Sequence, residues 1–92
     1  MTLTQLEYIV ALDSFRHFGK AAAHCHIAQP SLSLQVQKLE EELKTTIFSR
    51  NTMPVTTTET GAIIIEQAKK ILAETAMVSQ LIQQQKIVWK GI

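Results

Sequence analysis

A single long helix is predicted over residues 59–85, with Thr58 as its N-terminal cap. Its apolar residues recur at helical spacing and form a stripe along one side: Ile64, Ala68, Ile71, Leu72, Val78, Leu81 and Ile82. A helix of about 27 residues is about 40 Å long, which exceeds the width of a domain built from the residues before it. The stripe therefore needs a partner outside that domain, most simply the same helix of a second copy of the chain.

The composition favours one small folded domain with an extension. The chain has 92 residues, 46% of them hydrophobic, which favours a packed core over disorder. No run approaches the roughly 18 apolar residues of a membrane span, and the N-terminus lacks the pattern of a signal peptide. The one cysteine, Cys25, excludes an internal disulfide and suits a reducing compartment, so we expect a cytoplasmic protein without membrane contact.

Three shorter helices are predicted before the long one. The first covers about residues 4–14, where Thr4 and Glu7 have the spacing of a capping box. The second, over about 18–24, is rich in alanine, so another helix can approach it closely. The third, over 29–43, follows a tight turn.

The third helix has two different faces. The spacing of its core-facing residues is i, i+4, i+7 and i+11: Leu32, Val36, Leu39 and Leu43. Beside them lies an arc at the N-terminal end, where Pro30 fits the first helical position: Gln29, Pro30, Ser33, Leu34 and Gln37. The positive end of a helix dipole attracts phosphate, and short uncharged polar side chains can read base edges in a major groove. The alternative is an ordinary solvated face with an acidic end.

The segment after this helix predicts a two-stranded wing. The stretches "TTIFSR" and "PVTTT" are β-prone, and Pro54 confines the returning strand to an edge. Ile47 and Phe48 are expected in the core. His26, in the turn before the third helix, is expected to have a positive φ.

The predicted fold is therefore mainly α: a winged helix-turn-helix of three helices plus a two-stranded wing, followed by a long dimerisation helix. Residues 3–61 resemble the LysR-type transcriptional regulators, through "AA", "QPSLS", "LEEEL", "F.R" and "TE.G". The resemblance implies a DNA-binding domain over 1–58, with the helix-turn-helix at about 18–37. It also implies a linker helix over 59–85 that pairs antiparallel in a dimer, and a hinge over 86–92 toward an effector-binding domain.

The resemblance also assigns roles to single positions. It implies that recognition helix 29–43 enters the major groove of a double-stranded operator, where Gln29, Pro30 and Ser33 approach base edges and Leu34 faces the DNA. Gln37, on the same arc, completes the expected base-reading set. Phosphate contacts are expected from these residues: Lys20, Ser31, Lys38 and Arg50, with Arg16 as a further cation within reach. The expected dimerisation residues are Ile64, Ala68, Ile71, Leu72, Val78 and Ile82, and dimers of this family often assemble into tetramers.

Some positions depart from the family pattern. Lys44 stands where a glycine usually follows the recognition helix, Leu34 where arginine is common, and Met53 where the wing is often basic. These changes lower the expected DNA affinity. The wording "RHFGKAA..C" is similar to the hydrogen-peroxide-sensing activators of the family, which implies a role in the oxidative stress response. In that case the reactive cysteines would lie in the effector domain.

Charge and side-chain chemistry separate the remaining function classes. Net charge is +1, and up to Thr58 five lysines and arginines face five aspartates and glutamates, which keeps a protein-interaction module open as an alternative. No nucleophile–base–acid set or glycine-rich phosphate loop is present, so neither an enzyme nor a cofactor is expected. "HCH" at 24–26 predicts no metal site, because adjacent helical residues point about 100° apart. Specific binding to an operator would separate the regulator from the interaction module.

Overall fold

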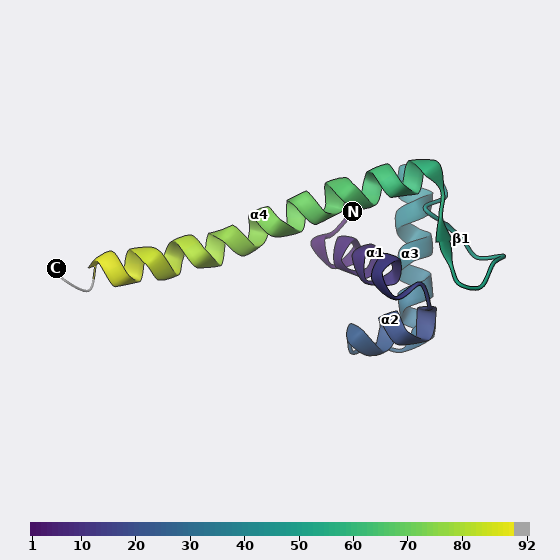
Figure 1. The fold of residues 1–92 in the computed structure, drawn as a ribbon, viewed down its shortest axis with the longest axis horizontal. Coiled ribbons are helices and arrows are strands. Elements are labelled where there is room, and N and C mark those ends of the chain that lie inside the picture. Colours follow the sequence, from purple (N-terminus) through teal and green to yellow (C-terminus); the bar gives the residue numbers. More distant parts are fainter. Residues whose placement is uncertain (90–92) are drawn as a thin grey trace.

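The computed structural model describes residues 1–89 of the chain. Its elements follow the order α1 (Leu3–Phe15), α2 (Phe18–His24), α3 (Gln29–Leu43), β1 (Phe48–Ser49), β2 (Thr56–Thr57) and α4 (Glu59–Trp89). Figure 1 shows α1, α2 and α3 gathered at one end of the molecule with the wing beside them, and α4 leaving this headpiece as a single rod. The predicted winged helix-turn-helix with a long helix is confirmed.

The N-cap of helix α1 lies two residues before its predicted position. Thr2 is the N-cap: its Oγ1 accepts a hydrogen bond from the Gln5 backbone N–H at 3.0 Å, and Gln5 Oε1 accepts from the Thr2 N–H at 3.0 Å. The predicted capping box of Thr4 and Glu7 is therefore wrong. Glutamine can close the same reciprocal pair as glutamate, so Thr2 and Gln5 form the capping box two residues earlier.

The core lies where the three short helices meet the start of α4 and the wing. Its buried members are apolar throughout: Leu6, Ile9, Ala11, Leu12, Ala21, Ala22, Leu32, Val36, Leu39, Ile47, Phe48, Val55, Ile65 and Ala68. The two alanines of α2 are the small contacts that allow α3 and α1 to approach, as the sequence predicted. Leu43, at the end of the predicted stripe of α3, packs partly buried at the edge of the core.

The wing is a short antiparallel ribbon. Phe48 pairs with Thr57 and Ser49 pairs with Thr56, so only two residues of each strand are in register. Phe48 faces the core, as predicted, and Pro54 lies in the loop before the returning strand. Thr58 then caps α4, because its Oγ1 accepts from the Gly61 N–H at 2.9 Å. The ribbon is therefore anchored at its base, and its loop projects away from the headpiece (Figure 1).

Helix α4 has a packed first half and a free second half. Ile65 and Ala68 are buried against the headpiece, and Ile71 and Leu72 pack at its edge. Beyond them the large apolar side chains are exposed: Met77, Val78, Leu81 and Ile82. The helix continues to Trp89, past the predicted end at 85 and into the segment 86–92 that was predicted to be a hinge. Residues 90–92 lie outside the described residues. Within residues 1–89 no helix has the length and hydropathy needed to cross a membrane.

Candidate nucleic-acid interface

The α2–turn–α3 unit is held by backbone hydrogen bonds and one unusual conformation. His17 caps α2, since its Nδ1 accepts from the Lys20 N–H at 3.1 Å. His26 has φ 59° and so reverses the chain, and the Ile27 N–H donates to the Ala22 carbonyl at 3.0 Å. The predicted positive φ at His26 is confirmed. These contacts fix the start of α3 against α2 and leave its outer face open.

The start of α3 has no side chain to cap it. Its N-cap is Ala28, and no side-chain hydrogen bond closes this end, whereas Thr2, His17 and Thr58 cap the other helices. Pro30 occupies the second helical position, one residue later than predicted, where it also lacks an N–H to satisfy. The positive end of the α3 dipole is therefore left for an external acceptor such as phosphate.

The predicted base-reading residues share the open face of α3. Gln29, Pro30, Leu34 and Gln37 are exposed and Ser33 is half-buried, while Leu32, Val36 and Leu39 on the opposite side are buried. Leu34 is 48% exposed although it is a large apolar residue. The geometry thus brings the five residues together on a neutral surface that combines amide, hydroxyl and apolar groups.

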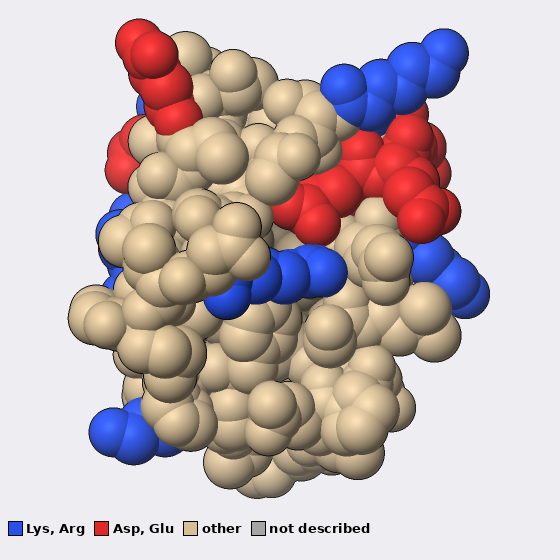
Figure 2. Space-filling view, turned by 90° about the vertical axis from the view of Figure 1, so that its right-hand side faces the viewer, with Lys and Arg blue, Asp and Glu red and all other residues tan. Residues whose placement is uncertain are grey.

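Charge is distributed unevenly over this end of the molecule. Figure 2 shows acidic side chains gathered mainly in the upper part of the face and few charged side chains in its lower part. The acidic group belongs to the C-terminal end of α3, and the start of α3 lies at the lower end in Figure 1. Of the predicted phosphate-binding residues, Lys20, Ser31 and Lys38 are exposed.

Arg16 makes hydrogen bonds and an ion pair within the chain. Its backbone has φ 55°, its Nε donates to the Asp13 carbonyl at 2.7 Å, and its Nη2 pairs with Asp13 Oδ1 at 2.8 Å. Arg16 also joins α1 to the wing, since the Val55 N–H donates to its carbonyl at 3.0 Å. The guanidinium thus closes the C-terminal end of α1, and its side chain is 40% exposed, so a phosphate contact by Arg16 stays a prediction.

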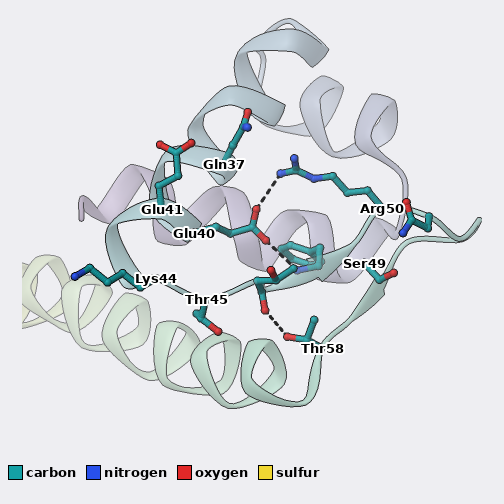
Figure 3. Close-up of a pocket in the computed structure, with 11 residues that line it drawn as sticks. Gln37, Glu40, Glu41, Lys44, Thr45, Ser49, Arg50 and Thr58 are labelled. Atoms are coloured by element: carbon teal, nitrogen blue, oxygen red, sulfur yellow. Dashed lines mark hydrogen bonds and ion pairs between the residues drawn. The ribbon is translucent and has the colours of Figure 1, made fainter.

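Arg50 and Glu40 line an open groove between α3 and the wing (Figure 3). Glu40 Oε2 accepts from the Ile47 and Phe48 N–H groups at 2.7 and 3.2 Å, and Glu40 Oε1 accepts from Arg50 Nη2 at 3.2 Å. Sequence reasoning placed Glu40 only in an acidic run and missed this role. The available signal was its position four residues after Val36 and one after Leu39, at the edge of the buried stripe.

The "HCH" segment shows no sign of a metal or redox site. Burial raises the pKa of the Cys25 thiol, and the Glu7 carboxylate raises it further, so the reactive thiolate is disfavoured. Cys25 packs partly buried against the core, and His24 stacks near Phe15 with ring centroids 5.1 Å apart. Among the described residues no group of three or more metal-ligating side chains is close enough to hold an ion.

Fold and surface together define a winged helix-turn-helix with an open recognition helix, the architecture of a DNA-binding module. Residues 3–62 match the model of the bacterial regulatory helix-turn-helix proteins of the lysR family. The chain belongs to the LysR family and provides its helix-turn-helix DNA-binding domain. The proteins of this family that match the chain are transcriptional regulators.

Individual relatives agree with this assignment. A hydrogen peroxide-inducible genes activator of Pectobacterium carotovorum subsp. carotovorum is 41% identical over 91 residues, and the match covers 99% of this chain and 30% of that protein. The DNA-binding transcriptional dual regulator OxyR of Escherichia coli (strain K12) is 40% identical with the same coverage. The chain thus spans about 30% of the length of these curated relatives.

Solved structures are similar over nearly the whole chain. A full-length OxyR variant from Pseudomonas aeruginosa is 46% identical with a TM-score of 0.87, covering 94% of this chain and 29% of that one. The BenM DNA-binding domain in complex with benA site 1 DNA is 39% identical with a TM-score of 0.85, and each chain is covered completely.

Proposed function

We propose that the chain binds a double-stranded operator sequence-specifically, with α3 in the major groove and Gln29 and Ser33 at base edges. The observation that carries the proposal is the neutral polar face at the uncapped start of α3. Pro30, Leu34 and Gln37 border the same surface. Gln and Ser offer both donors and acceptors there, and the exposed Leu34 suits a thymine methyl group.

Phosphate contacts would hold the helix in register without specifying sequence. Lys20, Ser31 and Lys38 are exposed around the neutral face, and Arg50 lies at the base of the wing. The BenM domain that is similar over its whole length was crystallised with DNA, which supports the same use of this fold here.

Gln29→Ala tests the base-reading role. We expect it to weaken binding to a duplex selected from a random-sequence pool by about 1–3 kcal/mol, while binding to mixed-sequence DNA stays nearly unchanged. Fluorescence anisotropy at fixed salt measures both affinities, and Gln83→Ala, an exposed glutamine of α4, is the matched control. Equal losses on both duplexes would show that Gln29 reads no base.

We further propose that the chain acts as a homodimer through the linker helix, with tetramers available to a longer protein. Ala68 is 1% exposed and covered by its own headpiece, so it leaves the set of residues offered to a partner. Ile64, Ile71 and Leu72 are partly buried in the same way. Among the predicted dimerisation residues the exposed ones are distal, where Val78 is 61% and Ile82 49% exposed, and Ile63 in the first half of α4 is a further exposed apolar residue at 69%.

A protein-interaction module is the second candidate, favoured by the balanced charge of the headpiece. Selection of one sequence from a random DNA pool would support the regulator, and failure to select any would support the module. The names of the relatives support a role in the oxidative stress response, which transcription assays with and without peroxide would test. A DNA-binding regulator of this kind would act in the cytoplasm. Cys25 does not supply the sensor in this proposal, because its thiolate is disfavoured.

A further inference from the structure

The Glu40 carboxylate connects the recognition helix to the wing and to the Arg50 cation. Its side chain is only 13% exposed, and each oxygen has a partner: Oε2 accepts from the backbone N–H groups of Ile47, just before β1, and Phe48, and Oε1 pairs with Arg50 at 3.2 Å. Figure 3 shows Glu40 pointing toward the wing and Arg50 reaching back to it, while Glu41 on the next position points away. Glu40 is therefore fixed from two sides before any DNA arrives.

Arg50 is held by a second contact besides Glu40. Its guanidinium carbon lies 5.4 Å from the centroid of the Phe18 ring, within the range of a cation–π interaction. The side chain is 34% exposed, so it is neither buried nor free in solvent. Glu40 engages Nη2 of Arg50, and its carboxylate charge weakens the attraction of the whole guanidinium for a phosphate. Glu40 thus restrains this cation and lowers its tendency to bind DNA.

We propose that Glu40 is a specificity-determining residue, because it restrains Arg50 and so suppresses binding to DNA of arbitrary sequence. This inference rests on the proposed operator binding. A loosely bound duplex cannot draw Arg50 from its two partners, whereas an operator seated on α3 brings a phosphate to a fixed place near the wing. Because the headpiece has no net positive charge, one restrained cation is a large share of its attraction for DNA.

Glu40→Gln is the direct test. The amide oxygen can still accept from the Ile47 and Phe48 N–H groups, but the charge that holds Arg50 is gone. We expect mixed-sequence DNA to bind about three- to tenfold more tightly at 0.1 M salt, and the slope of log K against log salt to steepen by about one per chain bound. Anisotropy titrations over a range of salt concentrations measure both quantities.

Two control variants distinguish the specific Glu40–Arg50 contact from the general effect of removing one negative charge. Glu41→Gln removes the same formal charge from the adjacent exposed position, and we expect less than a twofold change. In an Arg50→Ala background, Glu40→Gln should have no effect, because the restrained cation is absent. Equal effects of the two glutamine variants, or an effect that persists without Arg50, would overturn the proposal.

A second comparison keeps the proposal testable if Glu40→Gln does not fold, which circular dichroism would show. Arg50→Ala should weaken binding to the selected duplex at least fivefold and leave mixed-sequence binding within twofold. Equal losses on both duplexes would show that Arg50 is not restrained. If the wild-type chain does not discriminate between the duplexes at all, the proposed function itself fails; if it discriminates but the variants behave alike, only this inference fails.

Discussion

At the scale of single residues, the main loss of stability comes from residues at helix ends that adopt a left-handed backbone conformation. Arg16, His26 and Lys44 have φ between 54° and 59° although each carries a side chain. An L-residue loses about 1–2 kcal/mol in this conformation. Arg16 is compensated by its contacts to Asp13 and Val55. Lys44 has only backbone closure: its N–H donates to the Glu41 carbonyl at 3.2 Å, and the Thr45 N–H donates to the Glu40 carbonyl at 3.1 Å.

Lys44→Gly should therefore stabilise the domain by about 1 kcal/mol, because glycine adopts this conformation without a steric cost. Urea denaturation at fixed protein concentration would show a higher midpoint with an unchanged slope. Lys44→Ala is the control, since it removes the charge and keeps the strained backbone. A gain of the same size in the alanine variant would mean that the lysine side chain, and not its φ, is unfavourable.

The conformations of single residues were predicted correctly from the sequence where one local rule determined them. The positive φ of His26 and the Thr58 cap are confirmed, since each depends on neighbours within a few residues. Prediction failed where two local solutions compete, as with the Thr2 and Thr4 caps. It also missed partners distant in sequence, because nothing near Arg16 indicates Val55.

At the scale of elements, the start of α4 lies against the backbone of Ile47, just before β1. The Thr58 N–H donates to the Ile47 carbonyl at 2.9 Å, and Gly61, one turn into the helix, faces the same peptide. A Cβ on Gly61 would fall well inside contact distance of the Ile47 carbonyl oxygen. This close approach explains a glycine at a position where alanine would favour the helix.

Gly61→Ala should destabilise the domain by about 3 kcal/mol, because the backbone of α4 or β1 must move to admit the methyl group. The helix propensity of alanine acts in the opposite direction by about 1 kcal/mol, so the sign of the change identifies the clash. Thermal unfolding measures it, and Thr60→Ala, at the exposed preceding position, should change stability little. A stabilised Gly61→Ala chain would rule out the close contact.

The boundaries of an element could be predicted from the sequence where its residue pattern was strong. The bounds of α2 and α3 are those predicted, since alanine-rich and leucine-spaced segments with a tight turn between them leave little choice. The strands are only two residues long, because the wing is set by backbone contacts to α3 and α4 and not by an alternating pattern. The residues predicted to read bases lie on the side of α3 away from the core, and their role stays a prediction. The groove between Glu40 and Arg50 could be found only from the fold.

The whole molecule is a headpiece about 20–25 Å across with a helix that extends its length to 58 Å. The headpiece covers α4 as far as Leu72, and the apolar residues beyond it have no neighbour in the described part of the chain. An apolar stripe of this length on a solvated helix is unfavourable unless another surface covers it. The proposed dimer follows from this uncovered apolar stripe, because a second copy of the helix would cover it.

Ile82→Asp should convert the dimer to monomers, because it places an unpaired charge in the apolar surface. Sedimentation velocity at micromolar concentration measures the change, and Gln80→Asp, on the opposite side of the helix, is the control. Ile71→Asp would be a poorer test, since Ile71 packs against the headpiece and its loss would also destabilise the monomer. An unchanged dimer in the Ile82 variant would place the interface elsewhere.

The continuity of α4 also sets a rotational phase between the headpiece and the exposed apolar surface. Each added residue advances a helix by 1.5 Å and turns everything beyond it by about 100°. A one-residue insertion after Leu72 would therefore point Val78 and Ile82 to another side, although the spacing hardly changes. An insertion of about eleven residues, close to three full turns, would lengthen the helix and restore the phase. For the proposed dimer we therefore expect changes in the length of this linker to be tolerated only in whole turns.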